Sequence, residues 1–299
     1  MKILVTGASG LVGSALIPLL TASGHSVSRL VRNSQKTGAG AFYWNPATRE
    51  LDAAAVEGQD AVIHLAGESI ASGYWTKARK VRIRDSRVVG TQILADAIVN
   101  ASVPPQLLIS ASAIGYYGSP GAAVVDETNS DGDTWLAEIC REWEAATEAV
   151  RAEGVRVVNA RIGLVLTPEG GALGKMLLPF KLCLGGRLGH GRQYMSWITL
   201  DDMIRSLQFA VENESVSGPM NVVAPNPVTN LAFTKLLGGV LRRPTPFPVP
   251  AFFLRLVLGE MADELFFSSI RVVPKVLLDH GFEFTHGELE FGLRDILNR

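Results

Sequence analysis

The chain has 299 residues, of which 47% are hydrophobic and 19% charged, and its formal net charge is −1. This length allows one large domain or two smaller ones, and the near-neutral charge gives no electrostatic reason to expect a nucleic-acid or membrane-surface partner. The two cysteines, Cys140 and Cys183, do not form a disulfide framework and do not have a metal-binding spacing.

The sequence shows no sign of a targeting or membrane segment. The first expected strand starts at residue 2, which leaves no room for a signal peptide. No uncharged apolar stretch reaches about 18 residues, so no membrane span is expected. We therefore expect a cytoplasmic protein.

The first thirteen residues predict a buried strand followed by a phosphate-binding turn. Residues 3–5 form a short apolar run, which is typical of a strand buried on both faces. Gly7, Gly10 and Gly13 follow it and lead into an amphipathic helix expected from about Leu11 to Ala22. Glycines placed in this way allow a sharp turn, close approach of a pyrophosphate and close packing of helix on sheet, while the helix N-terminus attracts the phosphates. A tight turn that binds no ligand is the alternative.

The end of the second expected strand, Ser26–Val31, predicts which dinucleotide is bound. Dinucleotide folds contact the adenosine ribose at this place, and an acidic residue here would favour NAD. This chain has Arg32 instead, followed by Asn33 and Ser34. A guanidinium with hydrogen-bonding neighbours suits a 2′-phosphate, so we predict a preference for NADP. A solvated surface arginine is the alternative.

The next segments predict a loop with a short hairpin over residues 38–52 and a buried strand over 61–67. Gly67 closes that strand where its carboxyl end should meet the cofactor. His64 lies within the apolar run, and a lone histidine there favours a packed core residue over a ligand.

A long helix is expected over residues 77–101, and its apolar stripe includes the position of Arg87. An unpaired charge on a core-facing stripe is costly, so Arg87 needs an anionic partner. A cofactor phosphate is one candidate. A core carboxylate, or extension of the side chain to the surface, is the alternative.

The rest of the chain continues this alternation and then changes character. A strand over 107–111 runs into a loop over 112–118 at the carboxyl edge of the sheet, where open α/β sheets bind ligands. A helix over 134–152 and a strand over 156–166 follow. Beyond them we expect a glycine-rich loop at 185–191, a strand over 193–198, a helix capped by Asp201 that runs to Val211, and a proline-rich boundary at 225–250 before a smaller helical unit.

Several motifs together resemble the extended short-chain dehydrogenase/reductase family. More narrowly, the chain is similar to a sugar-epimerase-like subfamily with an extra C-terminal segment, described as nucleoside-diphosphate-sugar epimerase or cell-division-inhibitor-like. The motifs cover essentially the whole chain: Thr6-Gly-Ala-Ser-Gly-Leu-Val-Gly13, His64-Leu-Ala-Gly-Glu68, Ser112 through Gly118, Trp143-Glu144, Leu178-Pro-Phe with Gly185-Gly, Gly189 and Ser196-Trp-Ile198, and Gly281-Phe-Glu-Phe284.

The resemblance implies an α/β fold, with a doubly wound parallel Rossmann sheet and a smaller C-terminal substrate domain. The Rossmann domain would comprise residues 1–166 and about 199–224, and the mainly helical substrate domain about 167–198 and 225–299. The resemblance implies that the protein binds NADP(H) and a small-molecule substrate, and it is compatible with an oligomer. The positions implied for cofactor binding are Gly7, Ser9, Gly10, Leu11, Val12, Arg32, Leu65, Ala66, Gly67, Arg87 and Arg161.

The chain departs from this family at the catalytic pair. Extended members use a Tyr-x-x-x-Lys pair, in which the tyrosine handles the proton and the lysine lowers its pKa and holds the nicotinamide ribose. Counting back from Glu144 places Leu136 and Cys140 at these positions, and neither side chain supplies that chemistry. Ser112 and Tyr117 are the predicted catalytic residues, with Tyr116 second. Packing in the loop is the alternative for both tyrosines.

Two functions therefore stay open. The first is an NADP(H)-dependent oxidoreductase or epimerase acting on a nucleotide sugar or small carbonyl compound. The second is a catalytically weak NADP(H)-binding sensor or interaction protein. The sequence names neither the substrate nor the oligomeric state.

Overall fold

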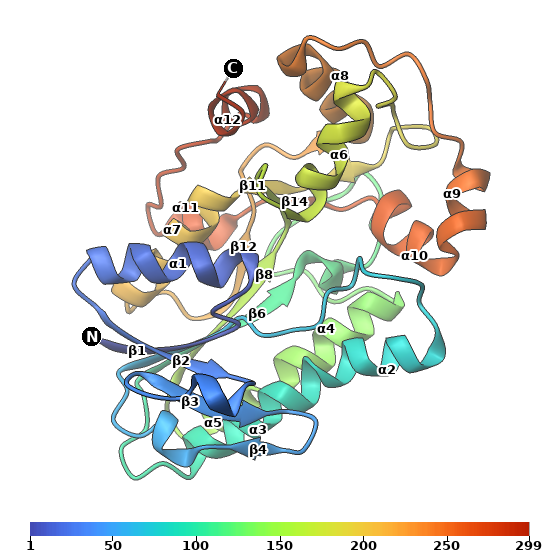
Figure 1. Ribbon diagram of the computed structural model, residues 1–299. Coiled ribbons are helices and arrows are strands. Elements are labelled where there is room, and N and C mark those ends of the chain that lie inside the picture. The colour runs from blue at the N-terminus through green and yellow to red at the C-terminus, as the bar shows by residue number, and fades with distance from the viewer. Residues whose placement is uncertain (299) are drawn as a thin grey trace.

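An eight-stranded sheet lies at the centre of the computed structural model, which describes residues 1–298 (Figure 1). All of its neighbouring strands are parallel except β3 and β4, which form the expected hairpin. In spatial order the strands are β12 (Gly218–Val222), β8 (Arg156–Ile162), β6 (Leu107–Ala113), β5 (Ala61–His64), β1 (Lys2–Thr6), β2 (Ser26–Val31), β3 (Ala41–Asn45) and β4 (Glu50–Leu51).

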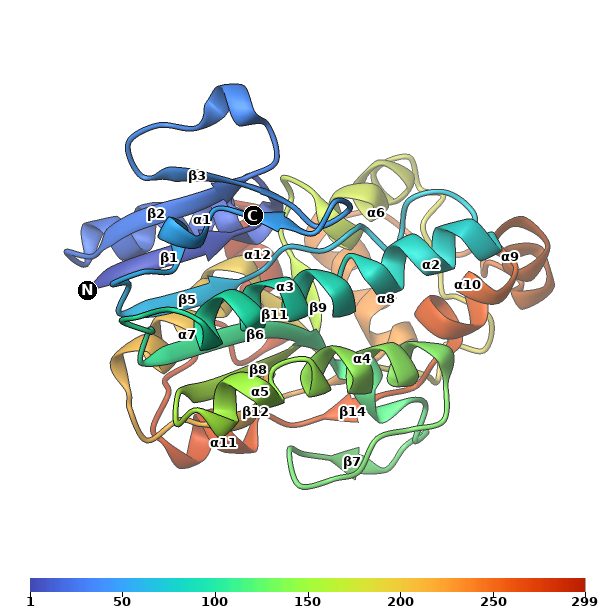
Figure 2. The same cartoon turned by 90° about the horizontal axis from the view of Figure 1, so that it is seen from below.

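Helices and short strand pairs complete the molecule (Figures 1 and 2). The short pairs are β10 (Tyr194–Met195) with β13 (Val228–Thr229), β11 (Trp197–Thr199) with β9 (Leu164–Leu166), and β14 (Arg271–Val272) with β7 (Val124–Val125). The α-helices are α1 (Leu11–Ala22), α2 (Lys77–Asp85), α3 (Val88–Val99), α4 (Trp135–Ala145), α5 (Glu148–Ala152), α6 (Gly171–Lys181), α7 (Leu200–Glu212), α8 (Asn230–Leu241), α9 (Ala251–Leu258), α10 (Glu260–Ala262), α11 (Lys275–Asp279) and α12 (Leu289–Ile296). None of these helices is long and apolar enough to cross a membrane.

The sheet is buried on both faces, as the apolar run of its first strand predicts. Ile3 and Val5 pack in a core with α1, α7 and α11, whereas Leu4 points the other way into a core with α3 and α5. This alternation follows from the two-residue period of a strand. The result is a three-layer α/β sandwich, which confirms the expected fold class.

The strand order places a ligand-binding edge beside β1. The chain runs from β1 to β2 and β3 on one side, and then returns to β5, β6, β8 and β12 on the other. In such sheets the connections leave neighbouring strands in opposite directions at the point of reversal. This opens a crevice outside the carboxyl ends of the strands, where ligands bind. The turn that follows β1 and the turn that follows β5 therefore meet at this edge.

A second core lies away from the sheet, where α6, α8 and α12 gather (Figure 1). It contains Leu177, Trp197, Phe233 and Leu293, which come from distant parts of the chain. The C-terminal region also contributes Leu277 to the core of the sheet. Residues of the C-terminal region thus contribute to both cores, and the expected division into a Rossmann domain and a substrate domain stays a prediction.

Two expected helices are each divided in two, and a hydroxyl side chain lies at each break. The helix over 77–101 is α2 and α3, and at the break the Ser86 hydroxyl donates to the carbonyl of Ile83 and accepts the N–H of Glu68. The helix over 134–152 is α4 and α5, and the Thr147 hydroxyl at the break donates to the carbonyl of Glu144.

Two expected strands are also divided. The strand over 156–166 is interrupted at Gly163, where a Cβ would lie 2.7 Å from the carbonyl oxygen of Ser196. The strand over 193–198 is β10 and β11. Thr199 rather than Asp201 caps α7, since its hydroxyl accepts the N–H of Asp202. By contrast, the helix from Leu11 to Ala22 and the strand from Ser26 to Val31 are confirmed.

Candidate cofactor-binding and active site

The three N-terminal glycines form a tight turn in which Gly7 and Gly13 have no space for a side chain. Gly7 adopts φ +68° and its carbonyl accepts the N–H of Gly10 at 2.9 Å. A Cβ on Gly7 would lie 2.8 Å from the Leu65 backbone, and one on Gly13 would lie 2.4 Å from the Gly7 carbonyl oxygen. The N-cap of α1, Gly10, provides no side-chain cap, so the first-turn N–H groups of α1 stay available to an anion.

A buried Thr6–His64 pair fixes the backbone at the end of β5 beside this turn. The Thr6 hydroxyl accepts the N–H groups of Leu65 and Ala66 at 3.1 Å each, so its own hydrogen points to Nδ1 of His64, 2.7 Å away. His64 is fully buried beside the edge of Trp44, and burial lowers its pKa to about 4. The imidazole is therefore neutral at pH 7, and its expected packing role is confirmed.

Arg32 lies at the carboxyl end of β2, the strand next to β1. Its side chain is exposed. The Oδ1 of Asn33 accepts the N–H of Gln35 and so caps a short 3₁₀ helix, Ser34–Lys36. The Asn33 amide group keeps its donors. Arg32 thus lies at the strand end where dinucleotide folds contact the adenosine ribose, and its contact with a 2′-phosphate stays a prediction.

Arg87 lies at the break between α2 and α3, with its guanidinium beside Gly67. Its Nη1 donates to the carbonyl of Ile83 at 2.9 Å, and its guanidinium carbon lies 5.2 Å from the centre of the Trp143 ring. Among residues 1–298 no carboxylate pairs with it, so the alternative of a core salt bridge does not hold there. Burial lowers the pKa of this arginine.

Ser112 is the sixth residue of β6 rather than part of the loop, and its hydroxyl donates to Glu144 Oε1 at 2.7 Å. The same carboxylate receives two hydrogen bonds from Arg161, each 2.9 Å long, and both side chains are almost wholly buried. Ser112 and Arg161 are register neighbours on β6 and β8, so the sheet itself brings this group together. Sequence reasoning missed the pairing, although an arginine inside a strand expected to be buried was its signal.

The two loop tyrosines occupy different surroundings. The Tyr117 hydroxyl donates to Asn221 Oδ1 at 2.8 Å and accepts from Arg161 at 2.9 Å, and the residue is only 4% exposed. Burial raises the pKa of Tyr117 to about 12. Tyr116 is less buried, and its ring lies over the Arg161 guanidinium, 3.5 Å from the ring centre. The catalytic role of Tyr117 stays a prediction.

The positions of the absent catalytic pair lie against this loop. A Cβ on Gly115 would be 3.4 Å from Leu136 Cβ and 3.8 Å from Cys140 Sγ. Burial raises the pKa of the Cys140 thiol to about 12, so it is uncharged at neutral pH. Position 140 therefore carries no charge, whereas the usual lysine would carry a positive one.

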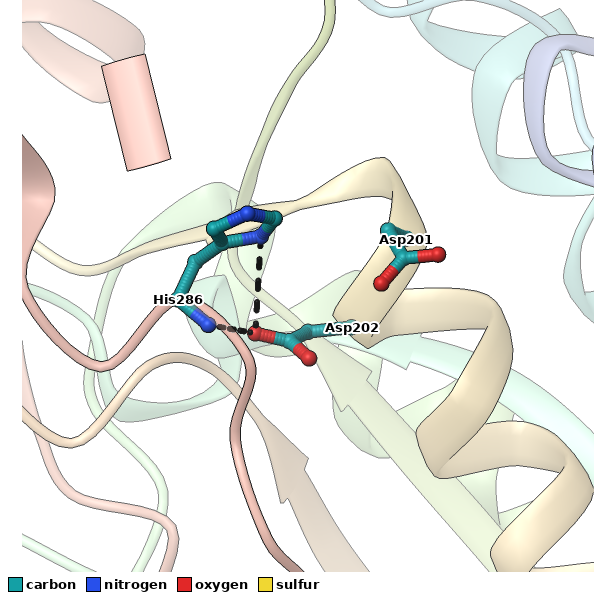
Figure 3. Close-up of side chains that lie close together, drawn as sticks. All are labelled: Asp201, Asp202 and His286. Atoms are coloured by element: carbon teal, nitrogen blue, oxygen red, sulfur yellow. Dashed lines mark hydrogen bonds and ion pairs between the residues drawn. The ribbon is translucent and has the colours of Figure 1, made fainter. Parts of the chain in front are cut away.

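Asp202, His286 and Asp201 form a separate cluster whose geometry resembles a metal site (Figure 3). The atoms of the two buried members are already engaged within the protein. Asp202 accepts from Arg205 and from the N–H groups of Thr285 and His286. The ring nitrogens of His286 contact the Thr199 hydroxyl at 2.9 Å and Asp295 at 3.1 Å, while Asp201 is exposed. This cluster fastens the C-terminal segment to the start of α7.

The parallel sheet and the uncapped glycine turn at its point of reversal define a dinucleotide-binding α/β protein. The chain belongs to the NAD-dependent epimerase/dehydratase family, whose model matches residues 3–223. Residues 249–296 match a domain of unknown function (DUF1731).

Several known proteins resemble the chain over nearly its full length. Epimerase family protein MT2273 of Mycobacterium tuberculosis is 45% identical, with 95% of this chain and 94% of that protein covered. YfhF of Bacillus subtilis is 39% identical (99% and 98% covered), and human SDR39U1 is 35% identical (99% and 100%).

Solved structures agree with this assignment. The crystal structure of human SDR39U1 with NADPH matches with a TM-score of 0.90 and 34% identity over all of both chains. The nucleoside-diphosphate sugar epimerase of Corynebacterium glutamicum matches with a TM-score of 0.83 and 32% identity, covering 99% of this chain and 58% of that one. The UDP-glucose 4-epimerase of Thermotoga maritima is 18% identical, with a TM-score of 0.76, and shares the fold.

Proposed function

We propose that this protein binds NADPH along the carboxyl edge of the sheet and reduces a small carbonyl compound or a nucleotide sugar. The observation that carries the proposal is the glycine turn, where Cβ atoms on Gly7 and Gly13 would meet neighbouring backbone atoms and where the N-terminus of α1 has no side-chain cap. The related human protein that crystallised with NADPH supports the choice of cofactor. The bound cofactor would supply the hydride.

The proposed binding residues follow the strand order of the sheet. Arg32 after β2 takes the 2′-phosphate, and Gly7 to Val12 after β1 take the pyrophosphate. The backbone at Leu65 to Gly67 after β5 borders the nicotinamide half. Arg161 is proposed to act indirectly, because its guanidinium is held by Glu144 and Tyr117.

Replacing Arg32 with alanine should weaken NADPH binding about tenfold and leave NADH binding almost unchanged. NADPH loses a charge-assisted contact to its 2′-phosphate, whereas NADH has no 2′-phosphate and never makes this contact. Tryptophan-quenching titrations measure both affinities. Arg29→Ala, three residues earlier on β2 and also exposed, is the matched control and should bind as the wild type does. An unchanged preference in Arg32→Ala would show that the 2′-phosphate lies elsewhere.

Within this proposal Ser112 and Tyr117 would hold and move the proton at the reacting carbonyl oxygen. Tyr117→Phe should then lower turnover by about 10²-fold or more, which is the usual contribution of a positioned acid. The measurement is transfer of deuterium from nicotinamide-labelled NADPH to a panel of small carbonyls and nucleotide sugars. Transfer that persists unchanged in Tyr117→Phe excludes Tyr117 and directs attention to Tyr116.

A second candidate function, a weakly catalytic NADPH-binding sensor, is favoured by one specific arrangement. The Ser112 hydrogen is committed to Glu144, and the Tyr117 hydroxyl already has two protein partners. Neither group is free to donate a proton in this arrangement. Tight NADPH binding without label transfer to any compound of the panel would support the sensor.

A further inference from the structure

Charge is distributed unevenly along the chain. Residues 170–200 and 215–259 contain eight lysines and arginines and no aspartate or glutamate. The rest of the chain therefore carries 20 of the 28 lysines and arginines and all 29 aspartates and glutamates. The formal net charge of −1 thus conceals a basic region, and a partner that meets this region meets a positive surface.

These two acid-free segments lie against each other in the fold. The Val249 N–H donates to the Arg187 carbonyl at 2.8 Å, and the Gly189 N–H donates to the Val249 carbonyl at 2.9 Å. A Cβ on Gly186 would collide with the Phe247 carbonyl oxygen. In both views α6 and α9 lie on the side of the molecule away from the N-terminus (Figures 1 and 2). The loop after α6, the segment before α9 and α9 itself therefore form one surface, which we call the apolar–basic face.

Helix α9 is apolar but has no buried residue. Seven of its eight residues are apolar, and Arg255 is the only charged one. Leu256 is 81% exposed and Phe252 71% exposed. The large exposed apolar side chains of the whole face are Leu182, Leu184, Phe247, Phe252, Phe253 and Leu256. A helix that is apolar on nearly every side is normally buried, and contiguous exposed apolar side chains mark an interaction site.

The cations of this face are available to a partner. Within residues 1–298 no carboxylate forms an ion pair with Lys181, Arg187, Arg192, Arg242 or Arg243. The acidic residues that follow α9 are already engaged. Glu260 pairs with Lys80 of α2 at 2.8 Å. Asp263 pairs with Arg255, also at 2.8 Å. The face therefore offers unpaired positive charge beside exposed apolar side chains.

This combination of charge and apolar surface selects the occupant. A second copy of the chain would bring the same basic face onto itself, because a twofold interface uses the same patch on both subunits, and like charges would then oppose each other. A nucleic acid would stack on the aromatic rings but leave Leu182, Leu184 and Leu256 exposed. An anionic bilayer provides phosphates for the cations and an acyl boundary for the apolar side chains.

We propose that the apolar–basic face docks on the surface of a membrane that contains anionic phospholipids. Phe252 and Leu256 enter the boundary between headgroups and acyl chains, and the arginines that precede α9 lie at the phosphates. The contact is peripheral and involves α9 lying in the plane of the membrane surface. This inference goes beyond the proposed binding of NADPH and does not depend on it.

Sedimentation of the full chain with vesicles tests the proposal. One set of vesicles contains phosphatidylcholine alone, and the other contains equal parts of phosphatidylcholine and phosphatidylglycerol. The wild type should bind the mixed vesicles at least about tenfold more tightly, and added salt should weaken this binding. Failure to bind the mixed vesicles, or equal binding to both sets, would overturn the proposal.

Replacing both Phe252 and Leu256 with serine should weaken binding to the mixed vesicles about tenfold or more, because the apolar contacts with the acyl boundary are lost. Both side chains are exposed, so thermal unfolding should match that of the wild type. Val103→Ser combined with Val124→Ser changes two exposed apolar residues elsewhere and should bind normally. Equal loss in this control would place the contact on another surface. Leu256→Ser alone replaces the double variant if that variant is unstable.

Replacing both Arg242 and Arg243 with glutamine tests the charge in the same way. Binding to the mixed vesicles should weaken about tenfold or more and become less sensitive to salt. The matched control is Arg29→Gln combined with Arg49→Gln, which removes two exposed arginines near β2 and β4 and should bind as the wild type does. Unchanged binding of Arg242→Gln with Arg243→Gln would contradict the role of the cations.

Sedimentation velocity without vesicles tests the competing occupant. A dimer of the wild type that Phe252→Ser with Leu256→Ser converts to a monomer would assign the face to a second copy and overturn the proposal. We expect no change in oligomeric state between the wild type and this variant.

Discussion

Replacing Arg161 with methionine should lower the free energy of unfolding by about 3–5 kcal/mol, because it leaves a buried carboxylate without its cation. The Arg161 side chain is 4% exposed and that of Glu144 12% exposed, so water does little to screen the loss. Tyr117 would lose a hydrogen-bond donor at the same time. Denaturant unfolding at pH 7 measures the change.

Two further variants separate loss of the ion pair from loss of an arginine. Arg141→Met removes the cation of the exposed Asp131 pair and should change stability little. Arg161→Met combined with Glu144→Leu removes both buried charges and should recover part of the stability that the single variant loses. A single variant as stable as wild type would mean that Glu144 is not held as a buried anion.

The stability of the protein should fall as the pH decreases from 6.5 to about 4, because the unfolded chain protonates His64 before the folded protein does. Burial lowers the folded-state pKa from 6.5 to about 4, so between these values the unfolded state binds more protons. The difference corresponds to about 3 kcal/mol of unfolding free energy by pH 4, and it is absent above pH 6.5. Urea unfolding across this range measures it.

Removing the imidazole should remove this part of the pH dependence. His64→Leu is expected to be less stable at pH 7, since the Thr6 hydroxyl loses its acceptor, but its stability should vary less between pH 6.5 and 4. The exposed His190 provides the control, because His190→Leu should keep the wild-type slope. Equal slopes in wild type and His64→Leu would contradict a neutral, buried His64.

Local patterns were sufficient to predict the first strand of the sheet and the turn and helix that follow it, but not β12. The apolar run at residues 3–5 and the glycine spacing determine a buried strand, a tight turn and a helix through neighbours in the sequence. The helix from Leu11 to Ala22 has the bounds expected for it. His64 was predictable for the same reason, since its flanking residues are apolar.

Contacts between distant segments were not predictable in this way. At the helix break the Ser86 hydroxyl accepts the N–H of Glu68, a contact that a count of apolar positions does not include. The bond between Glu144 of α4 and Arg161 of β8 joins two separate elements, and the Tyr117–Asn221 bond spans 104 positions. Because of these pairings, the Ser112 and Tyr117 hydroxyls already have hydrogen-bond partners within the protein. Only the structure could show this.

Binding of the two reduced dinucleotides to the wild-type protein tests the central claim most directly. Titration of purified protein with NADPH and NADH, followed by tryptophan quenching, should show saturable binding of NADPH at least about tenfold tighter than that of NADH. Equal or tighter binding of NADH would contradict the role of Arg32. Failure to bind either nucleotide would contradict the account of the glycine turn as a dinucleotide site.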